Sequence, residues 1–270
     1  MESLLEQGRS ASPGELTRKL PSAGPAFLEG ALDNPQLTTI HLLQLLRNPR
    51  ITPALIDRIA QNRAWLRHYR VRAALAVHPR TPGTIGVLVL SSLGWRDLAD
   101  VAQGPRVAPQ VRRMAERRLT ICLEEMAQGE RISLARMAGR GLIAALCEDD
   151  SARVIAALLQ NPRLLENDVL RLVSRFSAPG PVLRTVAHSD RFGPRREVQK
   201  CIARHPNTPA PVALRLLHEL GRADLREILR APRLPKLVEV AACRLLQGAP
   251  GSPERRQTRR KPRRAGRSST

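Results

Sequence analysis

A short proline motif recurs along this chain of 270 residues and limits what it can fold into. The motif is a small or polar residue, a proline, a variable residue that is most often arginine, and then an aliphatic residue or threonine, often followed by a second proline. It occurs at 48–53, 78–82, 104–107, 161–164, 205–209 and 231–235. The first proline disfavours helix at the residue before it, so each motif ends one helix. Where a threonine follows, its side chain can cap the next helix while the second proline takes the first helical position.

The segments between these motifs have the pattern of short amphipathic helices. Apolar residues recur at helical spacing on one face over 42–46 and again over 55–60. No stretch alternates apolar and polar residues in the manner of a half-buried strand. Hydrophobic residues make up 42% of the chain, which is enough to bury a substantial core. The sequence therefore predicts an all-α protein.

The chain also contains an internal duplication. Residues 60–119 align with residues 187–246 at a constant offset of 127 without a gap, and 18 of these 60 positions are identical. The alignment pairs His78 with His205 and Leu93-Gly94 with Leu220-Gly221. Identity of this extent predicts two related halves, each built of helix-pair units of about 25–30 residues.

Two segments resemble the repeat unit of the leucine-rich repeat variant family and of bacterial HEAT-like arrays. They are 71–82, VRAALAVHPRTP, and its duplicate 198–209, VQKCIARHPNTP. The clear match covers 71–90 and 198–217, with degenerate units around them. The resemblance implies a right-handed α-solenoid of short stacked helices and says little about molecular function. One described member of the variant family carries an iron–sulfur cluster in a cysteine-rich N-terminal segment, which this chain lacks, so no cofactor is expected.

Composition divides the chain into three parts. Residues 1–30 carry Pro13, Pro21 and Pro25 among serine, glycine and alanine, which predicts a flexible leader. Residues 31–247 form the predicted helical repeat domain, with halves at about 31–128 and 129–247. Residues 248–270 are low in complexity and cannot pack a core, which predicts a disordered basic tail.

The net charge of the chain is +21, and four lysines leave 41 arginines among the 45 basic residues. The part after Leu246 holds eight basic residues and one acid, so the remaining +14 is spread over 246 residues. Such an excess attracts phosphate, and the competing explanation is a solvated basic surface with a compositional preference for arginine. The tail is either an electrostatic arm or a basic end without a partner. Its candidate residues are Arg255, Arg256, Arg259, Arg260, Lys261, Arg263 and Arg264.

One segment combines aromatic and cationic residues, as interfaces with proteins and nucleic acids often do. It contains Trp65, Arg67, Tyr69, Arg70 and Arg72, and Phe192 followed by Arg195 and Arg196 occupies the duplicated position. A second candidate is the pair Arg112 and Arg113, which the duplicate replaces with Glu239 and Val240. Packing between repeats is the competing explanation for the first group, and a solvated helix face is the competing explanation for the second.

The duplicated histidines and aspartates are interpreted as helix-end residues. His78 and His205 precede the motif proline, where asparagine stands in other units, and are expected to satisfy terminal carbonyls. Asp97 and Asp224 each follow a Leu-Gly pair. The glycine suits a left-handed helix end, which would place the aspartate in the first turn of the next helix.

Metal sites and enzyme motifs are not predicted. Cys122, Cys147, Cys201 and Cys243 are far apart and have no histidine at ligand spacing, which is typical of small buried hydrophobic residues. The chain has no nucleophile elbow, P-loop or dinucleotide fingerprint. A HEAT-like alkylpurine DNA glycosylase is the one enzyme class kept open because Trp95 lies close to Asp97, although that family's catalytic pattern does not match around them.

These observations predict a non-enzymatic scaffold that binds another macromolecule, with a protein favoured, through a concave face. The first alternative is that the groove and the tail bind nucleic acid without sequence specificity. The N-terminus carries acids early and has no apolar core, so no signal peptide is expected, and no apolar run is long enough to span a bilayer. We therefore expect a cytoplasmic protein with no membrane partner and no small-molecule substrate.

Overall fold

The computed structural model describes residues 3–231 and 234–248, which form nineteen α-helices and contain no β-strand. The first ten are α1 (Leu4–Ser10), α2 (Pro13–Lys19), α3 (Pro25–Leu32), α4 (Thr39–Arg47), α5 (Pro53–Gln61), α6 (Arg63–Leu66), α7 (Tyr69–Val77), α8 (Gly83–Leu90), α9 (Trp95–Gln103) and α10 (Pro109–Cys122). The others are α11 (Gln128–Met137), α12 (Arg140–Leu146), α13 (Ala152–Leu159), α14 (Glu166–Ser174), α15 (Gly180–Ala187), α16 (Arg196–Arg204), α17 (Ala210–Glu219), α18 (Arg222–Leu229) and α19 (Lys236–Gln247). The all-α prediction is confirmed.

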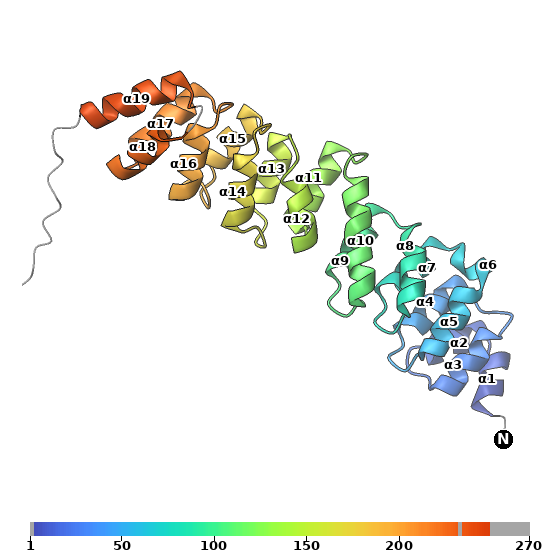
Figure 1. The fold of residues 1–270 in the computed structure, drawn as a ribbon. Helices are drawn as coiled ribbons and strands as arrows, with labels where there is room; N and C mark the ends of the chain where they lie inside the picture. The colour runs from blue at the N-terminus through green and yellow to red at the C-terminus, as the bar shows by residue number, and fades with distance from the viewer. Residues whose placement is uncertain (1–2, 232–233, 249–270) are drawn as a thin grey trace, which may run out of the picture.

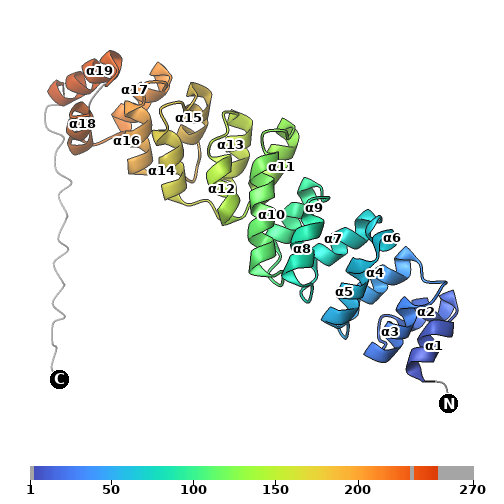
Figure 2. The same cartoon turned by 45° about the vertical axis from the view of Figure 1, so that its right-hand side comes forward.

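Helices that are close neighbours in the chain stack into an elongated array of two rows (Figures 1 and 2). The first row contains α2, α4, α7, α9, α11, α13, α15, α17 and α19. The second row contains α8, α10, α12, α14, α16 and α18, and α1, α3 and α5 share a core with the start of the first row. In both views, α11 to α19 of the first row lie along one side and α12 to α18 of the second row lie along the other. This arrangement is consistent with a helical repeat protein.

The core runs along the array between the helices. Buried apolar side chains from 11 to 75 form one cluster, and those from 76 to 242 form a second. Leu66 packs against both clusters, so the seam between them lies at α6 and α7. Each short helix can bury only one apolar stripe, and stacking against its neighbours makes these stripes continuous.

The N-terminal segment is folded, which differs from the flexible leader expected for residues 1–30. Residues 4–32 form α1, α2 and α3, and Leu16 and Leu28 within them are fully buried. Two of the three prolines that suggested a loose segment, Pro13 and Pro25, are the first residues of α2 and α3, and Pro21 lies in the turn between these helices. A proline at that position loses no helical hydrogen bond, so here it starts a helix.

Close contact between α1 and α3 holds this segment in place. A Cβ atom added at Gly30 would overlap the backbone of Leu5, and one added at Gly8 would overlap the backbone of Phe27. The two helices therefore approach at a distance that only glycine allows. Sequence patterning did not reveal this contact because it depends on two residues without side chains.

The duplication coincides with helix boundaries. Helices α7, α8, α9 and α10 begin at residues 69, 83, 95 and 109, and α16, α17, α18 and α19 begin at 196, 210, 222 and 236, each 127 residues later. The two members of a pair nevertheless belong to different rows, since α7 lies in the first row and α16 in the second. Duplicated residues therefore lie on different sides of the array.

The proline motif starts helices in two ways. Thr52 accepts a hydrogen bond from the amide of Leu55, and Pro53 is the first residue of α5, as predicted. Pro82 and Pro209 are instead the N-cap residues of α8 and α17, so the helix begins one residue later than expected. In both cases the motif joins the end of one helix to the start of the next.

The predicted basic tail cannot be compared with the structure. Its seven candidate residues, between 255 and 264, lie outside the described residues. Within residues 3–231 and 234–248, no helix is long and apolar enough to cross a bilayer.

Candidate functional site

The aromatic–arginine segment mainly supplies contacts between helices. Trp65 in α6 is half-buried and packs against the N-terminal core cluster. Arg72 in α7 donates to the carbonyl oxygens of Leu66 at 2.6 Å and Arg67 at 3.1 Å, which caps the end of α6. The side chains of Arg67 and Arg70 are exposed and form no ion pair with a described carboxylate. Only these two arginines of the segment remain free to contact a partner.

The duplicated segment is also used within the protein. Phe192 is buried, as the packing interpretation requires. Arg196 donates to Asp224 at 2.6 Å, and Arg195 lies 3.8 Å from Glu166. Both arginines therefore already have a carboxylate partner inside the fold.

The arginine pair on α10 lies on a polar helix face. Arg113 is exposed and Arg112 is half-buried, and neither forms an ion pair with a described carboxylate. Arg118, one turn further along, donates to the carbonyl oxygen of Ser91 at 3.3 Å. The structure does not bring Arg112 or Arg113 together with the aromatic–arginine segment on α6 and α7.

Asparagines that precede the motif proline join successive helices. Asn161 is fully buried, and its Nδ2 donates to the carbonyl oxygens of Ala135 at 2.8 Å and Ala138 at 3.1 Å, at the end of α11. Its Oδ1 accepts from the amide of Arg163 at 2.9 Å. The same three bonds recur at the asparagines that follow α3 and α4. Each asparagine thus satisfies helix-end carbonyls that would otherwise be orphaned.

The duplicated histidines have the corresponding role. The Nδ1 of His205 accepts from the amide of Asn207 at 3.1 Å, and its Nε2 lies 2.9 Å from the carbonyl oxygen of Arg175. The Nδ1 of His78 accepts from the amide of Arg80 at 3.1 Å, and burial together with the Arg80 charge lowers the pKa of His78. For His205 the helix-end interpretation is confirmed, although the carbonyl belongs to α14, the neighbouring helix of the row, and not to its own helix.

An aspartate in the first turn of one helix is bonded to the first residue of the preceding helix in its row. The three pairs, each 28 residues apart, are Tyr69–Asp97, Arg140–Asp168 and Arg196–Asp224. The first-turn position predicted for Asp97 and Asp224 is confirmed. Gly94 and Gly221 are N-cap residues with extended φ values of −72° and −77°, so the predicted left-handed helix ends are wrong.

These contacts keep the buried carboxylates ionised. The hydrogen bond from Arg196 lowers the pKa of Asp224 below its ordinary value, even though burial opposes this. Burial alone would raise the pKa of Asp168, but the hydrogen bonds from Arg140, the Leu165 amide and Arg171 lower it overall. The aspartates are therefore structural anions between helices rather than candidate proton donors.

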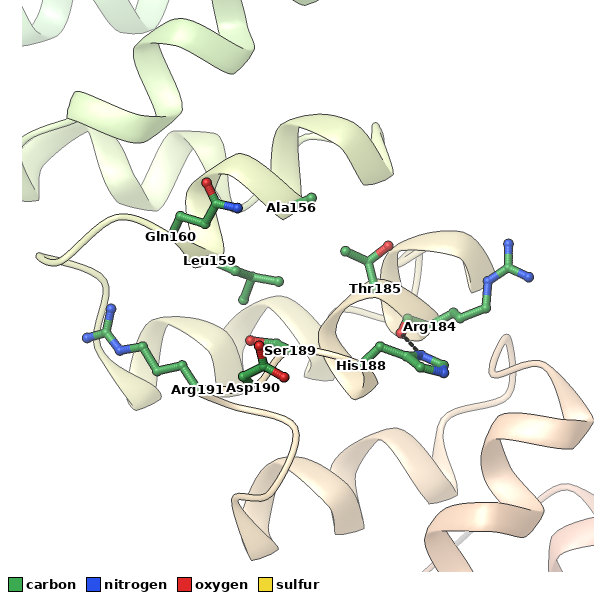
Figure 3. A pocket seen from close by; sticks show the side chains of 9 residues that line it. All are labelled: Ala156, Leu159, Gln160, Arg184, Thr185, His188, Ser189, Asp190 and Arg191. Carbon is green, nitrogen blue, oxygen red and sulfur yellow. Dashed lines mark hydrogen bonds between the residues drawn. The ribbon is translucent and has the colours of Figure 1, made fainter.

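Open grooves lie between successive helices of the first row. The groove between α13 and α15 has a volume of about 780 Å³ (Figure 3). Ala156 and Leu159 line it from α13, and Arg184 and Thr185 line it from α15 (Figure 3). The Nδ1 of His188 lies 2.7 Å from the carbonyl oxygen of Arg184. The Arg184 side chain is exposed and forms no ion pair with a described carboxylate.

A second groove, of about 590 Å³, lies between α4 and α7. Leu43 and Val77 give it an apolar lining, and Arg47 and Arg70 are exposed residues of the same lining. Asp100 of α9 also borders it. The structure thus places Arg70, a candidate from the aromatic–arginine segment, beside an apolar groove.

A third groove, of about 540 Å³, lies between α17 and α19. Leu214, Leu237 and Val240 line it together with Lys236 and Arg244. Leu237 and Val240 are 48% and 51% exposed, which is high for apolar side chains. All three grooves combine an apolar lining with exposed basic residues.

One further groove, of about 510 Å³, belongs to the second row and lies between α14 and α16. Phe176 lines it and is 76% exposed, and Arg204 lies beside it. No sequence pattern selects Phe176, because it stands alone in a loop. Sequence patterning did not identify the exposed apolar residues that line these grooves.

The residues considered for chemistry are engaged in structural contacts. Trp95 donates from Nε1 to Glu130 at 2.9 Å, and Asp97 is bonded to Tyr69. Burial raises the pKa of the Cys147 thiol to about 12. Among the described residues, no three histidine, cysteine, aspartate or glutamate side chains are placed to hold a metal ion. Trp95 and Asp97 therefore take part in contacts between neighbouring helices.

Comparison with known proteins adds no family assignment: no known protein family, curated protein or solved structure matches this chain.

Proposed function

We propose that this protein is a non-enzymatic helical-repeat scaffold that binds a protein partner through the grooves of its first row. The observation that carries this proposal is that three apolar grooves with exposed basic residues occur in the same row. An elongated array with repeated grooves can contact an extended partner at several points. Apolar linings supply burial, and the basic residues supply orientation and specificity.

The finer architecture belongs to the same proposal. The repeat resemblance at 71–82 and 198–209 supports a right-handed solenoid of HEAT-like or leucine-rich repeat variant type. The helix starts that recur after 127 residues support two halves that arose by duplication. The expected cytoplasmic location also belongs to this proposal.

Nucleic acid is a less favoured partner because the free arginines are not gathered on one side. Exposed arginines without a described carboxylate partner occur in both rows, as Arg47, Arg70 and Arg184 in the first and Arg113, Arg117 and Arg204 in the second. Many others donate to backbone carbonyls inside the fold, as Arg191 does to Asn161 and Leu164. Part of the arginine excess therefore stabilises the stack of helices.

Site-specific photo-crosslinking in the cells that make the protein tests the proposal. A photoreactive amino acid at Thr185, in the groove between α13 and α15, is expected to crosslink a discrete protein. The control position is Thr84, an exposed residue of α8 in the second row. Failure to crosslink at Thr185, or the same product from both positions, would contradict the proposal.

A binding series with duplex and single-stranded DNA and RNA separates the nucleic-acid alternative. The full chain and a version ending at Gln247 are titrated at increasing salt concentration. Binding that survives near physiological salt without the tail would assign the folded part to nucleic acid. If binding is lost when the tail is removed, a protein remains the favoured partner of the folded part.

A further inference from the structure

The groove between α17 and α19 has features that point to a specific kind of partner. We infer that this groove binds an acidic amphipathic helix of another protein, with the apolar side of that helix against Leu237 and Val240 and its carboxylates toward Lys236 and Arg244. This inference rests on the proposed function and adds the chemical class of the partner. The occupant follows from the exposed apolar side chains of α19 and from the charge around them.

Helix α19 packs an apolar stripe within the protein and also carries two large apolar side chains, Leu237 and Val240, that remain exposed. Val238 and Ala242 are buried against the core. Leu237 and Val240 lie on a different side of the helix and line the groove, whereas Ala241, which also lines the groove, packs partly against the core. Neighbouring apolar side chains on a helix are typically covered by another element, and in the described residues nothing covers these two.

The duplication provides an internal comparison that separates packing from function. Helix α10 begins 127 residues before α19 and carries Gln110 and Arg113 where α19 carries Leu237 and Val240. All four side chains are exposed. The repeat therefore tolerates polar residues at these positions, and stability does not require the leucine and valine of α19.

Charge around the groove selects an acidic occupant. Lys236 and Arg244 are exposed, form no ion pair with a described carboxylate, and line the groove, as does His218. Among the residues that the structure describes, no aspartate or glutamate lines it. A helix that places carboxylates beside Lys236 and Arg244 gains attraction from both residues, whereas a basic helix is repelled.

The groove between α4 and α7 lacks this one-sided charge. Arg47 and Arg70 border it, but Asp100 does as well. The groove between α13 and α15 likewise includes both Arg184 and Asp190. Selection for an acidic helix is therefore specific to the end of the array at α19.

Two synthetic peptides test this inference on the full 270-residue protein. Each is fluorescently labelled, about five helical turns long, and carries leucine at positions i, i+3, i+4 and i+7. One has glutamate at the other positions and the second has lysine there. Fluorescence anisotropy is expected to show binding of the glutamate peptide and at least about tenfold weaker binding of the lysine peptide.

The variant Leu237→Gln with Val240→Gln replaces both exposed apolar side chains without changing the charge of the groove, and it is expected to fold because α10 carries the exposed polar residues Gln110 and Arg113 at the equivalent positions. It is expected to lose at least about tenfold in affinity for the glutamate peptide. Arg244→Glu is expected to lower the affinity for the glutamate peptide and to raise the affinity for the lysine peptide. The matched control is Leu88→Gln, because Leu88 is an apolar side chain of α8 that is 64% exposed and lies outside the groove.

Each other outcome overturns the inference. Equal affinity for both peptides, or full affinity in the double variant, would show that the groove does not select an acidic helix. Concentration-dependent self-association that the double variant abolishes, without peptide binding, would assign the groove to a second copy of the chain. Crosslinking at Thr185 that persists in the double variant would leave the scaffold proposal standing when this inference fails.

Discussion

The bonds between neighbouring helices of a row predict a large effect for a single buried asparagine. Replacing Asn161 with alanine removes the donor to the carbonyl oxygens of Ala135 and Ala138 and the acceptor for the Arg163 amide. Asn161 and Ala135 are 0% exposed and Ala138 is 1% exposed, so water does not reach the two carbonyl oxygens without local opening. Leaving a buried polar group unpaired costs about 1–3 kcal/mol. Two buried carbonyls, each at the lower end of that range, predict a loss of about 2 kcal/mol in the free energy of unfolding, and the partly buried Arg163 amide adds less.

Urea unfolding followed by far-UV circular dichroism measures this loss. The matched control is Asn167→Ala, an exposed asparagine in the first turn of α14, which is expected to change stability by less than about 0.5 kcal/mol. Because a repeat array can open in parts, hydrogen exchange should show that faster exchange is concentrated in α11 and α13. A loss below about 1 kcal/mol for Asn161→Ala, with unchanged exchange there, would refute the reasoning.

A second variant tests the shared role of asparagine and histidine. Asn161→His places at this position the residue that follows α7 and α16. It is expected to lose less stability than Asn161→Ala, since a histidine ring can also accept an amide hydrogen and donate to a carbonyl. A histidine variant as unstable as the alanine variant would contradict this equivalence.

Three further predictions concern separate features. Gly30→Ala is expected to release α1 from α3, because its Cβ would overlap the backbone of Leu5, and limited proteolysis should then cleave the N-terminal segment. Gly14→Ala, which meets no atom within 4 Å, is the control and should leave proteolysis unchanged. Asp168→Asn is expected to destabilise the protein at neutral pH. The folded pKa of Asp168 is lowered, so its contribution is present above about pH 4 and fades as the pH falls through the folded value. Unfolding measured against pH should therefore show wild type and variant converging in acid, and a constant difference would contradict the assignment. Cys147 should react with a thiol reagent far more slowly than the half-buried Cys201, because its pKa is raised to about 12 by burial. Equal labelling of the two cysteines by mass spectrometry would show that Cys147 is accessible.

Local sequence rules predicted most of the helices and failed at the N-terminus. Apolar residues at helical spacing and proline at helix ends are local signals, so they are readable along the chain. Pro13 and Pro25 have the same local appearance whether they interrupt structure or start a helix. Only tertiary contacts distinguish the two possibilities. These contacts are the burial of Leu16 and Leu28 and the close approach at Gly30, and they involve residues from other helices.

The candidate site shows the same limit. The sequence identified aromatic and arginine residues by type, but the structure uses Arg72 and Arg196 for bonds between helices and leaves Arg70 exposed at a groove. Residue type cannot distinguish these roles, since a guanidinium group can bond a backbone carbonyl, a carboxylate of the protein or a partner. The partner of each arginine is set by which helix lies beside it.

The sequence by itself determined the all-α class, the presence of a helix end and a helix start at each proline motif that the structure describes, and the offset of 127 residues, because these follow from short-range sterics, periodicity and identity. The tertiary structure decided the rest. Stacking in two rows places duplicated helices on different sides, so that α10 presents arginine where α19 presents an exposed apolar side chain. Exposure and the opening of grooves depend on neighbouring helices, and for that reason the surfaces proposed to bind a partner emerged only from the folded protein.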